Sequence, residues 1–247
     1  MGLSVSVIVP CYNESERIAA TIAALNDYLT GQHRSFELIA VDDGSSDGTV
    51  AELERVARVI DALRVVRNGL NRGKGYSVKH GVQHASKEVV LFTDADLSTP
   101  AEEIGRALQV FETADFDIVI GSRTAPGANI EIRQPLYRVL MGRAFAFLIH
   151  SLLGLRGVSD TQCGFKVFRR EAAQDVFSRQ ILDRFAFDVE ILYLSQQLGY
   201  KVYEMPVTWR NRPESKVSPV RDSLRMFRDV VAIKRRHAGL SRSAARG

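Results

Sequence analysis

Two aspartates separated by one residue, Asp94 and Asp96, follow the apolar run Val89–Phe92 after the single residue Thr93. Carboxylate oxygens are preferred ligands of hard divalent ions, and two of them leave coordination positions for a diphosphate and for water. The pair therefore predicts a site for Mg²⁺ or Mn²⁺. A structural interpretation competes with it, because Asp96 or Ser98 could instead cap a helix that begins at Pro100.

A second acidic segment, residues 42–49, joins an apolar run to a helical pattern. Ser46 or Asp47 can cap that helix, which accounts for two of the polar residues. Asp42 and Asp43 are not explained by capping. An aspartate in such a loop can accept a hydrogen bond from a base N–H or from a ribose hydroxyl. The segment is therefore a candidate nucleoside contact.

A third segment, Asn71–Gly75, places Lys74 between two glycines. Glycines allow the backbone to approach a ligand closely, so the segment resembles a phosphate-binding turn. It does not have the spacing of a P-loop, and no P-loop is predicted. An ordinary helix start with an exposed lysine is the alternative interpretation.

The elements that position these residues alternate along the first half of the chain. Apolar runs of strand length are followed by patterns with apolar residues on one helical face. This alternation indicates right-handed crossovers and a mostly parallel sheet covered on both faces, which is the α/β class. The predicted strands are 4–9, 36–41, 63–66, 88–92, 117–120, 165–168 and 201–207, and the predicted helices are 14–29, 48–60, 73–85, 100–111 and 187–198.

Each polar cluster follows the carboxyl end of a predicted strand. This holds for residues 10–14, for residues 42–44, for the Asp94/Asp96 pair and for Gly121-Ser122-Arg123. In open parallel sheets, ligands bind at that edge. Clusters on four strands therefore predict a single site.

The composition is that of an ordinary globular protein, with 45% hydrophobic and 25% charged residues in a chain of 247. It suits one α/β domain. Two cysteines predict neither a disulfide framework nor a cysteine metal site, so a reduced cytoplasmic setting is expected. The first residues lack the pattern of a signal peptide. The apolar segment 136–155 contains Arg138, Arg143 and His150, and a charge at bilayer depth costs at least about 2.5 kcal/mol, so no membrane span is expected.

In combination, the motifs resemble family-2 glycosyltransferases of the GT-A fold. The similarity runs in order over nearly the whole chain. Two further stretches, Asp160–Lys166 and Phe185–Glu190, are similar to the dolichyl-phosphate β-glucosyltransferase branch of that family. The resemblance implies a Rossmann-like sheet flanked by helices and a metal-dependent hexosyltransferase with a nucleotide-sugar donor. The motifs that carry the resemblance to the family as a whole are Val7–Glu14, Val41–Thr49, Asn71–Gly75, Asp94–Asp96 and Gly121–Arg123.

The resemblance also implies roles for individual residues. Asp94 and Asp96 would contact ribose, metal and diphosphate. One departure from related mannosyltransferases is Ser98, which stands where they often carry glutamine. The residues that would hold the nucleotide are Pro10, Tyr12, Glu14, Asp42 or Asp43, Lys74 and Asp94, and those that would meet phosphate are Arg123, Arg138, Arg212 and Lys216, the last two in a basic loop.

The nature of the acceptor decides whether a catalytic base is needed. A hydroxyl would need a positioned carboxylate, whereas a phosphate monoester, with a second pKa of about 6, is already a dianion at neutral pH. The arginines of the second half favour a phosphate acceptor, although a solvated basic face would also explain them. Asp160 and Asp188 could be bases or could orient an arginine. The catalytic candidates are Asp96, Asp160, Arg123 and Arg138, and the acceptor-phosphate candidates are Asp188, Arg212 and Lys216.

Two segments, 136–155 and 219–236, have apolar residues at helical spacing with basic residues nearby. A basic amphipathic helix suits the surface of an anionic membrane, and packing on the core is the alternative. We expect a transferase domain over residues 1–218 and an amphipathic basic helix and tail over 219–247. The protein is expected to be peripheral on the cytoplasmic face of the membrane. The predicted apolar line of the last helix is Val220, Leu224, Phe227 and Val231.

These observations predict an inverting transferase that moves glucose from UDP-glucose to a polyprenyl (dolichyl-type) phosphate. The alternatives are a GDP-mannose-dependent polyprenyl-phosphate mannosyltransferase, a hydroxyl-directed glycosyltransferase of glycan synthesis, and a nucleotide-binding module without activity. The intact Asp94/Asp96 pair argues against the last. No nucleic-acid partner is expected. The sequence does not determine the oligomeric state or the choice between Mg²⁺ and Mn²⁺.

Overall fold

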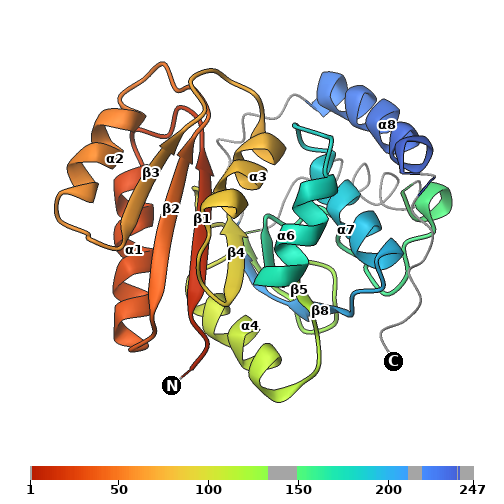
Figure 1. The fold of residues 1–247 in the computed structure, drawn as a ribbon, viewed down its shortest axis with the longest axis horizontal. Coiled ribbons are helices and arrows are strands. Elements are labelled where there is room, and N and C mark those ends of the chain that lie inside the picture. Colours follow the sequence, from red (N-terminus) through yellow and green to blue (C-terminus); the bar gives the residue numbers. More distant parts are fainter. Residues whose placement is uncertain (1, 133–148, 211–218, 238, 240–247) are drawn as a thin grey trace.

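The computed structural model describes residues 2–132, 149–210, 219–237 and 239. Seven strands form one sheet in the order β3-β2-β1-β4-β7-β5-β8, and a two-stranded sheet pairs β6 with β9. The alternation of strands and helices that the sequence predicts is confirmed (Figure 1). The strands are β1 (Val5–Cys11), β2 (Phe36–Asp42), β3 (Leu63–Arg67), β4 (Val89–Thr93), β5 (Ile118–Ser122), β6 (Asn129–Ile132), β7 (Phe165–Arg169), β8 (Val202–Pro206) and β9 (Thr208–Arg210).

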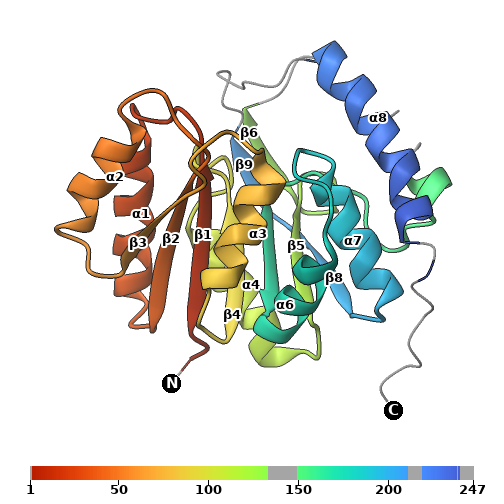
Figure 2. The same ribbon diagram turned by 45° about the horizontal axis from the view of Figure 1, so that its top comes forward.

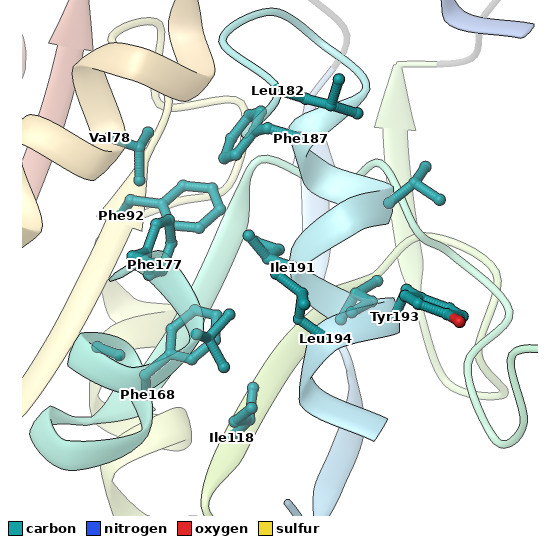
Figure 3. Close-up of a cluster of buried hydrophobic side chains, with 14 of the residues drawn as sticks. Val78, Phe92, Ile118, Phe168, Phe177, Leu182, Phe187, Ile191, Tyr193 and Leu194 are labelled. Carbon is teal, nitrogen blue, oxygen red and sulfur yellow. The ribbon is translucent and has the colours of Figure 1, made fainter. Parts of the chain in front are cut away.

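Helices cover both faces of the seven-stranded sheet. Buried residues of α1, α2 and α4 belong to one apolar core, and those of α3, α6, α7 and α8 belong to a second core on the other face. Figure 3 shows part of this second core, where Phe92 of β4 lies among Phe177 and Phe187. The helices are α1 (Ile18–Gly31), α2 (Thr49–Ala57), α3 (Lys74–His84), α4 (Glu102–Thr113), α6 (Arg170–Arg179), α7 (Phe187–Gln197) and α8 (Pro219–Arg236).

The strands β4 and β5 are buried at every position, as expected for strands covered on both faces. Strand β7 is the exception to the parallel order, because it pairs antiparallel with both of them. The other four pairings of the large sheet are parallel. The first residue of β7, Phe165, pairs with the last residue of β4, Thr93. The reversed direction thus brings the residues before β7 to the edge where the parallel strands end.

Some elements were absent from the sequence predictions. Helix α6 follows β7 directly and buries Ala172, Ala173, Val176 and Phe177. The small sheet pairs β6, which comes soon after β5, with β9, which comes soon after β8. Strands of four and three residues are too short to show an alternating pattern, so periodicity could not predict them.

The predicted last helix is confirmed as α8, and it lies beside α7 (Figures 1 and 2). Its described apolar contacts are made by Val230 and Ile233, which are fully buried in the second core. Val231, on the predicted apolar line, is 42% exposed. At its C-terminal end, α8 therefore packs on the core with a different face from the predicted apolar line. The domain boundary at 218/219 stays a prediction.

The other predicted amphipathic segment, 136–155, lies outside the described residues up to position 148. Its described end packs on the protein, because Ile149, Leu153 and Leu155 are buried in the second core. Among the helices that the structure describes, none is long and apolar enough to cross a membrane.

Candidate active site

The carboxyl ends of β1, β2, β4 and β5 and the start of β7 lie at one edge of the sheet, toward the top of Figure 2. In open parallel sheets ligands bind at that edge. The polar clusters predicted from the sequence therefore meet there. The segment before β7 joins them only because of its antiparallel direction.

Asp94 and Asp96 lie in a tight turn after β4. The amide of Leu97 donates to the Asp94 carbonyl at 3.1 Å, and the amide of Ser98 donates to Asp96 Oδ1 at 2.8 Å. Leu97 has a φ of 47°, a left-handed conformation that is costly for a leucine and is found at functional turns. The following helix, α4, begins at Glu102 without a side-chain cap, so neither Asp96 nor Ser98 caps it.

A glycine makes room for the Asp94 carboxylate. A Cβ atom added at Gly164, in the segment before β7, would lie 1.9 Å from Asp94 Oδ2. Any side chain at this position would displace the carboxylate. Gly164 thus packs directly against the Asp94 carboxylate, a contact that only the pairing of β7 with β4 reveals.

Lys74 pairs with the same carboxylate from the other side. Its Nζ lies 2.6 Å from Asp94 Oδ1. Burial alone lowers the pKa of Lys74, but Asp94, Asp188 and Asp96 outweigh it and raise the pKa well above its ordinary value. The lysine is therefore a permanent cation at the site, as the nucleotide-binding prediction requires.

The two glycines on either side of Lys74, Gly73 and Gly75, pack closely against another part of the chain. A Cβ added at Gly73 would lie 2.5 Å from the Asp183 carbonyl, and one at Gly75 would lie 2.6 Å from Phe187 Cβ. Gly73 also has a φ of 114°, which L side chains rarely adopt. The close backbone approach predicted for a ligand is thus made with the segment before α7 and with Phe187 at the start of α7, while the Lys74 side chain reaches Asp94.

Asp43, which is buried, holds the loop between β3 and α3. Its carboxylate accepts hydrogen bonds from Asn68 Nδ2 at 2.8 Å, from the Arg72 amide at 3.0 Å and from the Gly73 amide at 2.8 Å. Asp42 is buried too and accepts from the amides of Gly44 and Ser45. Both predicted nucleotide carboxylates therefore also have structural roles.

The loop after β1 is bound to the loop after β2. Asn13 donates its amide to Ser45 Oγ and accepts from the Ser46 amide, and the Glu14 amide donates to Thr49 Oγ1 at 2.7 Å. Glu14 also pairs with Arg17 at 2.7 Å. Pro10 and Tyr12 lie in the same region, and Tyr12 is 38% exposed. The loops form a preorganised wall on which a nucleobase can lie.

Arg123 and Asp160 form a bidentate pair across β5 and the segment before β7. Arg123 Nε and its amide donate to Asp160 Oδ2 at 2.7 and 2.9 Å, and Arg123 Nη2 donates to Oδ1 at 2.8 Å. Burial raises the pKa of the Asp160 carboxyl, but the Arg123 guanidinium outweighs it and lowers the pKa overall. Asp160 therefore orients an arginine and is a poor base. Trp209 on β9, which the sequence did not suggest, has its ring centre 5.5 Å from the guanidinium carbon of Arg123.

A second charge pair is fully enclosed. Lys166 on β7 is 0% exposed, and its Nζ donates to Asp188 Oδ1 at 2.6 Å and to the Cys163 carbonyl at 2.8 Å. Asp188 on α7 is thus paired with a lysine. The sequence analysis predicted a different role for it, as a contact of the acceptor phosphate, as a base or as a residue that orients an arginine. Lys166 stood in the motif Asp160–Lys166 but was not singled out, because a lysine in a strand is normally exposed.

The cysteines supply no nucleophile. Burial raises the pKa of Cys163 to about 12, and burial also raises the pKa of Cys11 well above its ordinary value. Both thiols therefore stay protonated at neutral pH.

Three predicted phosphate contacts, Arg138, Arg212 and Lys216, lie outside the described residues. Within the described residues, no group of three or more histidine, cysteine or carboxylate side chains could hold a metal. The Asp94/Asp96 pair still fits a divalent ion, because it offers hard oxygen ligands in a hydrogen-bonded turn, next to a glycine that leaves room for the Asp94 carboxylate. The remaining ligands would come from a diphosphate and from water.

The chain is similar to known proteins over most of its length. Residues 6–177 match the model of glycosyl transferase family 2. The chain is 34% identical to the dolichyl-phosphate beta-glucosyltransferase of Dictyostelium discoideum, over 96% of this chain and 75% of that protein. It is 33% identical to the human protein of the same name, over 94% of this chain and 75% of that one, and 32% identical to the Saccharomyces cerevisiae protein of that name, over 93% and 73%.

Solved structures show the same fold. Glucosyl-3-phosphoglycerate synthase from Mycobacterium tuberculosis, in complex with Mn²⁺, UDP and glucosyl-3-phosphoglycerate, matches with a TM-score of 0.70 and 21% identity, over 95% of this chain and 80% of that chain. The same enzyme with Mg²⁺ and UDP matches with a TM-score of 0.69 and 21% identity, over 95% and 79%. The predicted GT-A fold is thereby confirmed.

Proposed function

The chain belongs to glycosyl transferase family 2, and we propose that it transfers glucose from UDP-glucose to a dolichyl-type polyprenyl phosphate. The relatives' shared name carries this conclusion, since they are about a third identical to this chain over more than nine-tenths of it. They form a β-glucoside, and the glucose of UDP-glucose is α-linked, so the reaction inverts the anomeric carbon.

The turn after β4 is the proposed centre of donor binding. Asp94 and Asp96 would hold Mg²⁺ or Mn²⁺, ions that accompany UDP in the Mycobacterium tuberculosis enzyme. When bound, the ion supplies positive charge against the leaving diphosphate. Lys74, a permanent cation beside Asp94, adds a second positive charge at the same place.

Arg123, which follows β5, is the proposed second contact for phosphate. Asp160 holds its Nε and Nη2 atoms, so the guanidinium is oriented before any ligand arrives. Preorganised charge of this kind stabilises a developing anion without reorganisation at the moment of reaction. Trp209 limits the other side of the guanidinium.

A phosphate acceptor agrees with the state of the two candidate bases. Asp160 has a lowered pKa and is occupied by Arg123, and Asp188 is occupied by Lys166. Neither carboxylate is placed to remove a proton from a hydroxyl. A phosphate monoester needs no such base, because it is largely a dianion at neutral pH. Arg138, Arg212 and Lys216 remain proposed contacts for the acceptor or donor phosphates.

We also propose that the protein binds the cytoplasmic face of a membrane through α8. The last turn of the helix carries Lys234, Arg235 and Arg236, which are exposed, and Val231 is exposed beside them. Basic residues next to apolar ones favour the surface of an anionic bilayer. Salt-sensitive binding to vesicles that contain phosphatidylserine would test this part.

A donor and acceptor screen tests the function. Release of the nucleoside diphosphate should be fastest with UDP-glucose and polyprenyl phosphate, slower when GDP-mannose replaces UDP-glucose, and absent when neutral polyprenol replaces polyprenyl phosphate. Faster turnover with GDP-mannose would favour the mannosyltransferase alternative. Comparable transfer to a sugar hydroxyl would favour the hydroxyl-directed one.

The metal assignment is tested with Asp96→Asn. The variant should lose about 10²–10³-fold in turnover, the range seen when one electrostatic stabiliser is removed. Its Mn²⁺ affinity, measured by electron paramagnetic resonance in the presence of UDP, should fall as well. Asp115→Asn, at an exposed position, is the control. Unchanged Mn²⁺ binding in Asp96→Asn would contradict the assignment.

A further inference from the structure

A buried carboxylate outside the candidate site, Glu190 on α7, joins separate segments of the chain. Glu190 is 0% exposed. It accepts hydrogen bonds from the amides of Ile181 at 3.1 Å and Leu182 at 2.8 Å, and His237 Nε2 lies 2.7 Å from its Oε1. An ionised carboxylate only accepts, so His237 is the donor in the last contact.

His237 marks the end of α8. Its side chain is buried, and its amide donates to the Ile233 carbonyl at 3.0 Å. Val230 and Ile233 are fully buried in the core that α7 also lines, and the rings of His237 and Tyr193 lie 6.4 Å apart. The hydrogen bond to Glu190 is thus a polar contact between the C-terminal end of α8 and α7.

The two amide contacts of Glu190 hold the segment 180–183, which lies on the first turn of α3. The Tyr76 amide donates to the Asp183 carbonyl at 3.0 Å, and Gln180 Nε2 donates to the Gly75 carbonyl at 3.0 Å. A Cβ at Gly75 would lie 2.7 Å from the Leu182 carbonyl. Segment 180–183 and the first turn of α3 are therefore closely packed, so a shift of one requires a shift of the other.

That first turn carries Lys74, whose Nζ contacts Asp94. An unbroken series of contacts thus runs from the end of α8 through Glu190 and segment 180–183 to the proposed donor site. We propose that Glu190 and His237 are positioning residues of the transferase: they seat α8 and, through the same carboxylate, set the position of Lys74 for the donor diphosphate. The inference rests on the proposed function for the nature of that ligand.

Through this series of contacts, the packing of α8 on α7 and the binding of the diphosphate depend on each other. Coupling between sites is reciprocal, so if seating of α8 favours diphosphate binding, diphosphate binding must favour seating of α8 by the same factor. A residue that only stabilised the fold would not transmit this effect. The two sides of the coupling can be measured separately.

The test uses UDP with Mn²⁺ as the probe and the full chain. In the wild type, UDP with Mn²⁺ should slow hydrogen exchange at the amides of residues 230–237. Glu190→Gln places an NH₂ group against N–H donors, so it should weaken UDP binding in calorimetry by about fivefold or more, the lower end of typical site-to-site coupling. It should also abolish the slowing of hydrogen exchange in α8 that UDP with Mn²⁺ causes.

His237 supplies the matched pair of variants. His237→Gln keeps a donor at this position and should restore most of the UDP affinity and the protection, whereas His237→Leu should lose both. Val59→Ala, at an exposed position after α2, should behave like the wild type. If Glu190→Gln does not fold, the comparison of His237→Gln with His237→Leu decides.

The inference is overturned if the wild type binds UDP and His237→Leu retains the same UDP affinity and the same protection of α8. Absence of UDP binding in the wild type would overturn the proposed function together with this inference. The two failures are therefore distinguishable.

Discussion

Two parts of the site hold their carboxylates in different ways. In the loops after β1, β2 and β3, here called the donor loops (residues 10–15, 42–49 and 68–75), Asp42, Asp43 and Asp47 accept hydrogen bonds from amides, hydroxyls and a side-chain amide. In the charge-pair region (residues 123, 160–166 and 188), Asp160 and Asp188 each face a cation.

The difference indicates what each part can bind. Hydrogen bonds from neutral groups fix the shape of the donor loops but leave the negative charge of Asp42, Asp43 and Asp47 in place, which suits the N–H and hydroxyl groups of a nucleoside. Lys74, at the end of these loops, is the cation that we propose for the donor diphosphate. The charge-pair region places Arg123 and Lys166 beside the turn that carries Asp94. We therefore expect phosphate groups at Arg123 and at Lys74, whereas Lys166 is 0% exposed and is paired with Asp188.

The largest expected effect on stability is in the charge-pair region. Lys166→Met should lower the free energy of unfolding by about 3–5 kcal/mol, because it leaves Asp188 buried without a cation. Urea unfolding monitored by circular dichroism would measure it. Lys201→Met breaks the exposed pair with Asp115 and should change the free energy of unfolding far less, because water screens an exposed pair.

A double variant sharpens this prediction. Lys166→Met with Asp188→Leu replaces the whole pair by apolar groups and should recover most of the lost stability. If Lys166→Met alone costs no more than Lys201→Met, the pair does not contribute as a buried ion pair, and the contrast between the two regions fails.

An intermediate effect is expected in the donor loops. Asp43→Asn replaces one acceptor oxygen by an NH₂ group and leaves a donor among Asn68, Arg72 and Gly73 unsatisfied. Without nucleotide, the free energy of unfolding should fall by about 1–3 kcal/mol. The amides of Arg72 and Gly73 should exchange faster. Exchange rates like those of the wild type would show that Asp43 does not hold this loop.

The smallest effect is a pH dependence from Asp47. Its partial burial raises the pKa, but hydrogen bonds from Thr49 and Ser15 outweigh it and lower the pKa from 3.8 to about 2. A lowered folded-state pKa means that the contribution is complete above the unfolded pKa and is lost as the pH falls toward about 2.

Because Asp47 is exposed, its contribution should stay below about 1 kcal/mol. The difference in unfolding free energy between the wild type and Asp47→Ala should be constant above pH of about 5 and should shrink as the pH falls. A difference that grows on acidification would contradict the assignment.

The sequence by itself determined the order of elements and the edge at which the polar residues gather. Apolar runs and helical periodicity are local properties, and the carboxyl ends of successive parallel strands must share an edge. Asp43, Asp94, Asp96 and Arg123 could therefore be predicted to share one site from the sequence. The motifs also indicated the family, because each combines residue types with a position on a strand or turn.

Only the tertiary structure decided which charge faces which. The antiparallel direction of β7 places Gly164 against Asp94 and Asp160 against Arg123. The partner of Asp188 is Lys166, and the line of α8 that packs is set by α7. These facts depend on contacts between residues far apart in the chain. Spacing along the sequence carries no information about strand direction or about which long side chain reaches a buried carboxylate.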